Sequence, residues 1–444
     1  MKIQLSDHFT YEKLLRFTLP SIAMMIFTSI YGVVDGFFVS NFAGDIPFKA
    51  VNLTWPFLMI MSTVGFMFGT GGTAIVAYTL GQGDHERANS HFSLFVYVTA
   101  GLGVVFGVLS FIFIRPIVSL LGATGEILEN CVVYGRIVLC ALPFIVMQYL
   151  FQSFLVAAEK PHLGLVVTVA AGVTNMVLDA VLVMALPQEH KLAGAAIATA
   201  LSQVVGGGVP LVYFARKNSS ILRLGRTRYD SRALLKACTN GSSEFMSNVS
   251  MSLVGMLYNL QLIKYAGDDG IAAYGVMMYV SMIFSAVFIG YSIGSAPVIS
   301  YHHGARNYGE LHGLLRRSLV LISASAVVMF AAAEWLAAPL ARIFVSYSAP
   351  LLDMTVHGFR IFSLAFLFMG FAIFGSSFFT ALNDGLTSAL TSFLRTLVFQ
   401  VGAVLLLPLA LGLDGIWYSV VAAELMAVVF SAIFLIAKRK KYHY

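Results

Sequence analysis

The sequence predicts an all-α polytopic membrane protein with twelve transmembrane helices in two pseudo-symmetric six-helix lobes. The first reason is composition: 59% of the 444 residues are hydrophobic, only 11% are charged, and the mean hydropathy is +0.85. A soluble domain carries about a quarter charged residues. The second reason is a series of apolar segments of spanning length. The third is an internal repeat with an offset of 223 residues.

The membrane spans are predicted from length and apolarity, because a spanning helix needs about 20 mainly apolar residues. Polar, Gly and Pro clusters separate most of them. The predicted spans are 14–39, 50–79, 91–114, 130–157, 162–185, 192–215, 234–264, 271–301, 314–337, 352–382, 386–411 and 413–437.

The longest polar link, residues 216–233, divides the chain into an N-terminal six-helix lobe (1–215) and a C-terminal six-helix lobe (234–444). We expect this link to be a basic cytoplasmic linker. Six spans in each half give both halves the same orientation, so the repeat is predicted to be parallel, with its axis along the membrane normal.

The repeat preserves small residues and does not preserve acids. The matched positions are Gly32, Ala43, Gly44, Ala50, Gly71, Tyr78, Gly81, Gly135 and Ala158, paired with Gly255, Ala266, Gly267, Ala273, Gly294, Tyr301, Gly304, Gly358 and Ala381. By contrast, the position equivalent to Asp35 in the second repeat is Tyr258, and the position equivalent to Asp179 is Gly402. Duplicated membrane proteins are most often transporters, whose lobes rock against each other around a central site. The alternative is a duplication that only enlarges a scaffold.

The basic residues predict the orientation. When both termini are placed in the cytoplasm, most of the 27 Lys and Arg residues fall at cytoplasmic ends and loops, as the positive-inside rule requires. We therefore expect a multi-pass protein of the cell (inner) membrane whose basic residues set topology beside the lipid bilayer rather than bind nucleic acid. We expect a monomer.

No pattern points to an enzyme or to a bound cofactor. The chain has no phosphate-binding loop, its His residues lack metal-ligand spacing, and its three Cys residues form no ligand motif. Ionisable residues inside the spans remain, and their cost in lipid makes each one a functional hypothesis.

An oxygen-rich cluster is predicted inside the N-terminal lobe. Asp35 shares a helical face with Thr28 and Tyr31, and Asp179 lies one turn after Asn175. Counting from the outer ends of their spans places Asp35, Asp179 and Thr199 at one depth. Such oxygens suit a hard cation such as Na⁺, and the carboxyl groups could equally take up a proton. The alternative is that each acid only bonds a neighbouring Thr, Tyr or Asn.

A substrate cavity is predicted between the lobes. Glu244 could face it and hold a cationic substrate, or it could pair with Arg395, for which Glu424 is another predicted partner. The residues assigned to this cavity are Glu244, Tyr31, Thr28, Met246 and Met278. Methionines make adaptable surfaces that suit varied ligands.

These residues resemble the multidrug and toxic compound extrusion (MATE) family, and most closely its bacterial MepA-like and DinF-like branch. The resemblance covers nearly the whole chain. It rests on the two six-span lobes, on Pro20 fifteen residues before Asp35, on the N-x-x-x-D of Asn175 and Asp179, and on Thr199 in GAAIATALSQ.

The resemblance implies a secondary active multidrug efflux antiporter that exchanges H⁺ or Na⁺ for amphipathic, often cationic compounds by alternating access, and so contributes to antibiotic resistance. It implies a coupling-ion site at Asp35 and a first span that bends at Pro20. Two departures are Ala296 before Pro297, where many relatives carry Gln, and a tenth span in which the acid of Na⁺-coupled relatives is not evident and Arg360 and His357 are the polar residues.

Two other functions are weighed against the antiporter. A lipid-linked oligosaccharide flippase of the same superfamily should line its cavity with Arg and Lys, whereas the in-span charges here are mainly carboxylates. A channel or a membrane receptor is the third alternative. A channel more naturally has symmetric pore-lining rings, and the two halves of this chain differ in their charges.

Overall fold

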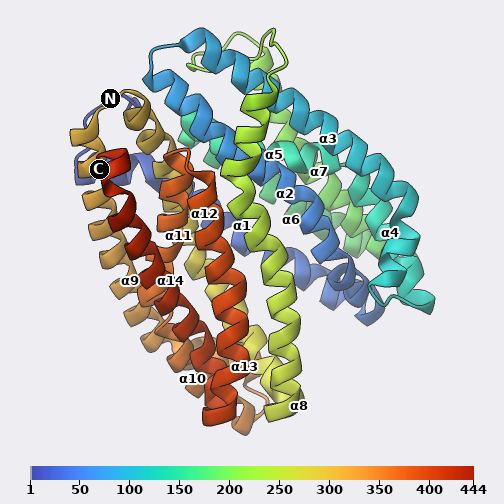
Figure 1. The fold of residues 1–444 in the computed structure, drawn as a ribbon. Helices are drawn as coiled ribbons and strands as arrows, with labels where there is room; N and C mark the ends of the chain where they lie inside the picture. Colours follow the sequence, from blue (N-terminus) through green and yellow to red (C-terminus); the bar gives the residue numbers. More distant parts are fainter. Residues whose placement is uncertain (1–2) are drawn as a thin grey trace.

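The computed structural model describes residues 3–444, apart from the side chains of Phe37 and Ser40. Every regular element within this range is a helix. The helices form two bundles that lie close together at one end and diverge toward the other (Figure 1). Both chain termini and the residue 216–230 link lie at the end where the bundles meet, which we call the basic end.

The N-terminal lobe contains seven helices within the described residues. They are α1 (Tyr11–Phe38), α2 (Asp45–Gly81), α3 (His85–Leu120), α4 (Gly125–Cys140), α5 (Leu142–Ala157), α6 (Pro161–Ala185) and α7 (Lys191–Ala215). A π-helical turn, Val39–Ala43, extends α1, and a 3₁₀ turn, Gln188–His190, precedes α7.

The C-terminal lobe repeats this order. Its helices are α8 (Ser231–Gly304), α9 (Tyr308–Val345), α10 (Ala349–Ser363), α11 (Phe366–Ala381), α12 (Gly385–Phe393), α13 (Gln400–Leu411) and α14 (Leu413–Tyr442). A π-helical segment, Leu394–Phe399, joins α12 to α13.

The predicted spans are recovered as helices. By length and composition, nine helices of the described chain could cross a membrane, or eleven when two bent pairs count as one span each. The 74-residue α8 contains two further predicted spans, 234–264 and 271–301, because its backbone leaves the helical conformation at Gly267 (φ 60°, ψ −150°). When α8 is counted as two spans, the eleven candidates become the twelve spans that the sequence predicts.

Two predicted single spans are broken. Span 130–157 is the pair α4 and α5, bent by 57°, and span 352–382 is the pair α10 and α11, bent by 47°. Pro143 explains the first break, because a proline in the first turn of α5 has no N–H to continue the α4 ladder. No proline accounts for the second break, which occurs at the equivalent position of the repeat.

The repeat also fixes matching turns. Gly44, after the first span, and its repeat partner Gly267 both have a positive φ, 107° and 60°, which glycine adopts without steric cost. Asp84 caps α3 by accepting a hydrogen bond from the Arg87 amide at 3.0 Å. Its repeat partner Asn307 caps α9 in the same way.

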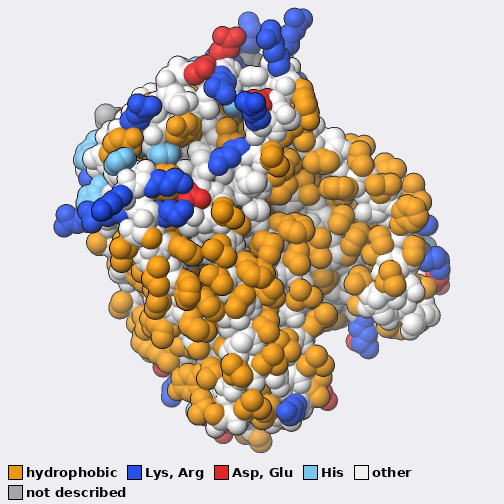
Figure 2. Space-filling model, viewed as in Figure 1, with side chains coloured by type: hydrophobic (Ala, Val, Ile, Leu, Met, Phe, Trp, Pro, Cys, Tyr) orange, Lys and Arg blue, Asp and Glu red, His pale blue; other side chains and the backbone are white. Residues whose placement is uncertain are grey.

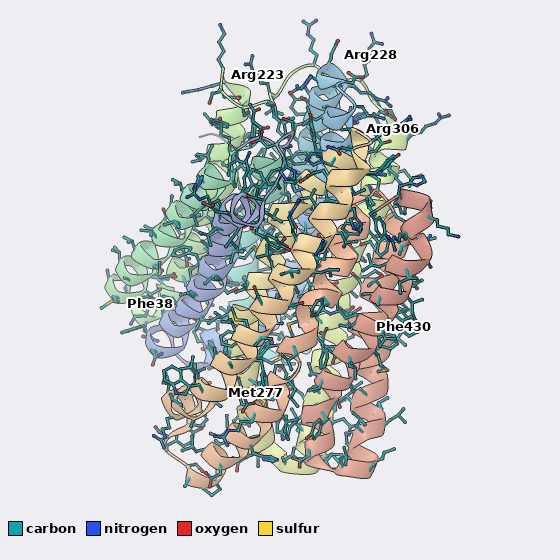
Figure 3. All side chains as sticks on the ribbon, turned by 90° about the vertical axis from the view of Figure 1, so that its left-hand side faces the viewer. Phe38, Arg223, Arg228, Met277, Arg306 and Phe430 are labelled. Atoms are coloured by element: carbon teal, nitrogen blue, oxygen red, sulfur yellow. The ribbon has the colours of Figure 1, made fainter. Side chains whose placement is uncertain are left out.

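The surface matches a membrane protein. Figure 2 shows hydrophobic side chains over the flanks of both lobes, with Lys and Arg gathered at the basic end. In the perpendicular view Arg223, Arg228 and Arg306 lie toward this end, whereas Phe38, Met277 and Phe430 lie farther along the bundle (Figure 3). The apolar belt is the part that lipid would cover.

The lobes contact each other at the basic end through a symmetric pair of glycines. A Cβ on Gly81 would lie 2.0 Å from the carbonyl oxygen of Tyr301, and one on Gly304 would lie 2.0 Å from that of Tyr78. Tyr78 and Tyr301 are themselves repeat partners, so the two contacts mirror each other. Only glycine permits this backbone approach between α2 and α8.

The N-terminal segment reinforces this closure. The backbone amide of Leu5 donates to Glu159 in the N-terminal lobe, and that of Phe9 donates to Glu310 on α9, each at 2.9 Å. Leu5 and Phe9 are fully buried, and Arg317 also binds Glu310 at 3.1 Å. Residues 5–9 therefore bridge the two lobes.

We predict that Gly81→Ala and Gly304→Ala each weaken the contact between the lobes, because the added methyl group forces α2 and α8 apart. Overpacking of this kind costs about 1–3 kcal/mol. Thermal unfolding in detergent should show a lower Tm for both variants. Gly309→Ala is the matched control, since its Cβ would meet nothing within 4 Å. Unchanged melting of both interface variants would contradict the contact.

Candidate cation site in the N-terminal lobe

The close packing of α1 on α6 positions the acids. Gly172 on α6 allows this approach, because a Cβ there would lie 2.4 Å from the Phe27 ring and 3.0 Å from the Tyr31 ring. Helix α7 packs on the same α6. The three helices thus converge at the level of Asp35 and Asp179.

Asp35 and Asp179 are close enough for their carboxyl groups to interact, and Asn175 is the other polar neighbour of Asp35. Asp179 and Asn175 are buried, and Asp35 is half-buried. Thr199 is also buried and joins the group through Tyr134, which faces Thr199 and both acids. The structure therefore brings together all four residues of the predicted oxygen cluster.

Six buried oxygens in and beside this cluster have no hydrogen-bond partner by geometry among the described residues. The unpartnered buried atoms are Asp35 Oδ1, Asp179 Oδ1 and Oδ2, Asn175 Oδ1, Thr199 Oγ1 and the Tyr134 hydroxyl. Buried polar atoms are nearly always bonded, so a group of orphans indicates a missing ligand or water. The alternative that Asp35 only bonds a neighbouring threonine does not hold for Thr28. The Thr28 hydroxyl donates instead to the Met24 carbonyl at 2.9 Å.

The ligand types limit the cation that would fit. Asp35 and Asp179 are the only acids in the cluster, and its other members offer neutral oxygens. The described residues contain no group of three or more His, Cys, Asp or Glu side chains that could hold a metal ion. Softer transition metals such as Cu and Zn prefer nitrogen and sulfur ligands, whereas oxygen ligands suit hard cations.

Sequence reasoning missed three polar residues of this region. Tyr134 on α4 lies close to both acids and to Thr199, and Tyr31 faces Gln148 on α5 and Gln203 on α7. Gln148 and Gln203 are buried, with an unpartnered Oε1 each. Each is a polar side chain inside a predicted span, a signal that marks it as a candidate but does not say which neighbouring helix it faces.

The residues predicted for the substrate cavity divide between the lobes. Thr28 and Tyr31 lie on α1, on the helix that carries Asp35, whereas Glu244, Met246 and Met278 lie on α8. Helices α1 and α8 pack together, and the Ser29 hydroxyl lies 3.4 Å from the Met282 carbonyl. Glu244 is half-buried and Met278 is exposed.

The predicted ion pair between Arg395 and Glu424 is confirmed. The Arg395 guanidinium donates from Nε and Nη2 to both carboxylate oxygens at 2.9–3.1 Å, and the two side chains are 18% and 3% exposed. Arg395 is near enough to Glu244 for an electrostatic interaction, but the two side chains form no ion pair within 4 Å. The carboxylate of Glu244 therefore remains available.

Helix α1 runs without interruption from Tyr11 to Phe38, through Pro20. Gly290 on α8 packs against the backbone of Ser21 and Ile22, directly after this proline. The bend at Pro20 stays a prediction.

The MatE family model matches residues 20–181 and 245–405 of the chain, once in each lobe. The chain is 26% identical over 322 residues to the multidrug export protein MepA of Staphylococcus haemolyticus, covering 72% of this chain and 70% of that protein. It is 24% identical over 418 residues to MepA of Staphylococcus saprophyticus, covering 93% and 91%.

Solved structures show the same fold. A MATE protein in complex with MaL6 aligns with a TM-score of 0.93 at 22% identity, covering 98% of both chains. A MOP superfamily transporter from Pyrococcus furiosus aligns with a TM-score of 0.91 at 22% identity, with the same coverage.

We predict that Arg395→Met and Glu424→Gln are each destabilising, whereas the double variant regains most of the loss. Removing one partner leaves the other charge buried and unpaired, which costs about 3–5 kcal/mol. Denaturation of the purified protein in detergent would measure all three variants. Additive effects of the two substitutions would contradict the pairing.

Proposed function

Because the chain belongs to the MatE family, we propose that it is a secondary active multidrug efflux antiporter that exchanges H⁺ or Na⁺ for amphipathic, often cationic compounds. The observation that carries this proposal is the group of unpartnered buried oxygens around Asp35 and Asp179. The name of the MepA relatives, multidrug export protein, supports the substrate class.

The orientation follows from the distribution of basic residues. We infer that the basic end faces the cytoplasm, since positively charged loops remain on that side. The protein would then be an inner-membrane monomer with both termini inside. The glycine contacts between α2 and α8 would close the cytoplasmic side, and the lobes would diverge toward the outside (Figure 1).

The coupling cation would act through two carboxylates that share one site. When both are charged and unliganded they repel each other inside an apolar bundle, so a proton or a Na⁺ ion entering from outside stabilises the arrangement in which α1 packs tightly on α6. A ligand shifts a conformational equilibrium only by its difference in affinity between the two states. Movement of α1 upon ion binding would supply that difference.

Helix α1 also connects the ion to the substrate. Thr28 and Tyr31 lie on the helix of Asp35, and Glu244 lies across the interface on α8. We infer that a cationic substrate binds near Glu244 between the lobes and leaves when ion binding displaces α1, with Pro20 as the point of bending. Proline removes one backbone hydrogen bond and makes such a bend inexpensive.

The flippase alternative receives no support from the charges. A pyrophosphate substrate needs free cations in the cavity between the lobes, and Arg395, the arginine near Glu244, is neutralised by Glu424.

We predict that Asp35→Asn and Asp179→Asn each abolish most ethidium efflux from a drug-sensitive host. A neutral amide lacks the negative charge that would bind the incoming H⁺ or Na⁺, so the exchange for substrate should fail. Glu12→Gln is the matched control on α1, since Glu12 is exposed and pairs with Arg16 one turn away. Undiminished efflux by Asp35→Asn at equal expression would remove the assigned role.

The coupling ion can be identified in proteoliposomes with separately imposed Na⁺ and pH gradients. We expect one of the two inward gradients to drive ethidium transport by the wild type. The same gradient should fail to drive Asp179→Asn. Transport at equal rates without any gradient would exclude antiport.

A further inference from the structure

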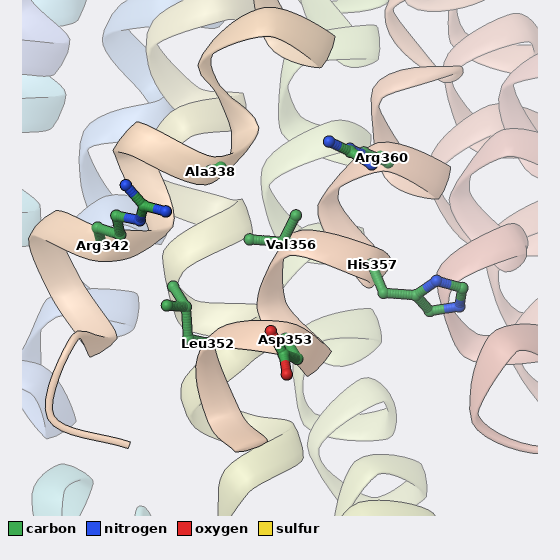
Figure 4. A pocket seen from close by; sticks show the side chains of 7 residues that line it. All are labelled: Ala338, Arg342, Leu352, Asp353, Val356, His357 and Arg360. Carbon is green, nitrogen blue, oxygen red and sulfur yellow. The ribbon is translucent and has the colours of Figure 1, made fainter. Parts of the chain in front are cut away.

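A second site lies at the end of the C-terminal lobe opposite the basic end. The last turns of α9 and the length of α10 line an open, solvent-accessible cavity of about 330 Å³. Its lining residues, shown in Figure 4, are Ala338, Arg342, Leu352, Asp353, Val356, His357 and Arg360. It lies in the other lobe from the candidate cation site and shares no residue with it.

The cavity holds two unpaired cations from different helices. Arg342 on α9 and Arg360 on α10 both lack a carboxylate within 4 Å among the described residues. Figure 4 shows their guanidinium groups turned toward the space between the two helices. His357 is turned away and binds Asp414 on α14 at 2.9 Å, so it adds no further cation to this space.

One carboxylate accompanies the two arginines. Asp353 lines the same cavity, is exposed, and forms no ion pair within the described chain. It lies seven residues before Arg360, which places both on one face of α10. The cavity therefore offers two guanidinium groups and one carboxylate to a single ligand.

The surroundings are those of a membrane–water boundary. Trp335 and Tyr347 are 81% and 78% exposed, and Ile343 is 73% exposed. One face of α9 carries Trp335, Ala338 and Arg342, which are spaced by three and four residues. The exposed Trp335 ring therefore lies on the same helix face as the cavity-lining residues Ala338 and Arg342. Tryptophan and tyrosine concentrate at lipid headgroup level.

We propose that this cavity binds the phosphoethanolamine headgroup of a zwitterionic phospholipid. Arg342 and Arg360 would hold the phosphate, for which the arginine fork is well suited. Asp353 would accept hydrogen bonds from the primary ammonium, and the acyl chains would run along α9 past Trp335. This inference does not depend on the proposed antiport.

The charge pattern selects this headgroup over its relatives. A choline headgroup offers the same phosphate, but its quaternary ammonium has no hydrogen to donate to Asp353. A glycerol headgroup has no cation and would leave Asp353 unpaired next to a phosphate. Both should therefore bind more weakly to the same two arginines.

Native mass spectrometry of the detergent-purified full chain tests the proposal with phosphatidylethanolamine, phosphatidylcholine and phosphatidylglycerol of identical acyl chains. We expect the wild type to retain phosphatidylethanolamine about tenfold better than phosphatidylcholine, the effect of one charge-assisted hydrogen bond. Arg342→Gln with Arg360→Gln should lose this binding. Asp353→Asn should keep phosphate binding but lose the preference over choline.

Soluble phosphoethanolamine distinguishes the source of the headgroup. If it competes only at large excess, the ligand is a membrane lipid, as we expect, whereas competition equal to that of the lipid assigns the site to a soluble phosphoethanolamine. Arg136→Gln is the matched control, because Arg136 lies over the Phe111 ring on the N-terminal lobe. Equal retention of the three lipids by the wild type, or equal losses in the control and the double variant, would overturn the proposal.

Discussion

Keeping two carboxylates together inside an apolar helix bundle is costly, and the proposed transport cycle depends on that cost. Asp35 and Asp179 interact across the α1–α6 contact, and their buried oxygens have no hydrogen-bond partner among the described residues. Charged groups of this kind are rare in membrane spans because burial removes their hydration. A pair without a neutralising arginine is stable only with a bound cation or a proton. The contrast within the same chain is Glu424, which is buried like Asp179 but is paired with Arg395.

The internal repeat explains both the symmetry of the scaffold and the asymmetry of the site. Symmetric contacts at Gly81 and Gly304 hold the lobes together at the basic end. At the position equivalent to Asp35, the C-terminal lobe has Tyr258, whose buried hydroxyl is satisfied by Gln400 at 2.8 Å. The equivalent position to Asp179 is a glycine. The duplication therefore supplies two lobes that can rock against each other, and only one of them carries an ionisable pair in this place.

Much of this could be predicted from the sequence, because the hydrocarbon core imposes a simple rule on span length and composition. Helical spacing and depth along the spans brought Asp35, Asn175, Asp179 and Thr199 together correctly, and apolar surroundings made the Arg395–Glu424 pair predictable. The breaks between α4 and α5 and between α10 and α11 were not, since each pair of helices together has the length and hydropathy of a single span. Tyr134, Gln148 and Gln203 were missed because their participation depends on how α4, α5 and α7 rotate toward α1, which no single-helix pattern reports.

The most direct test of the central claim is the distance between the lobes at the open end, measured by pulsed electron spin resonance on the reconstituted protein. Spin labels at Leu120 and Tyr347 suit this measurement, because both residues are highly exposed at the ends of α3 and α9. If the acid pair controls the separation of the lobes, the distance between the labels should shift with Na⁺ or with pH in the otherwise wild-type chain. In the double variant Asp35→Asn, Asp179→Asn, the distance should respond to neither. The same shift in the double variant would contradict the account.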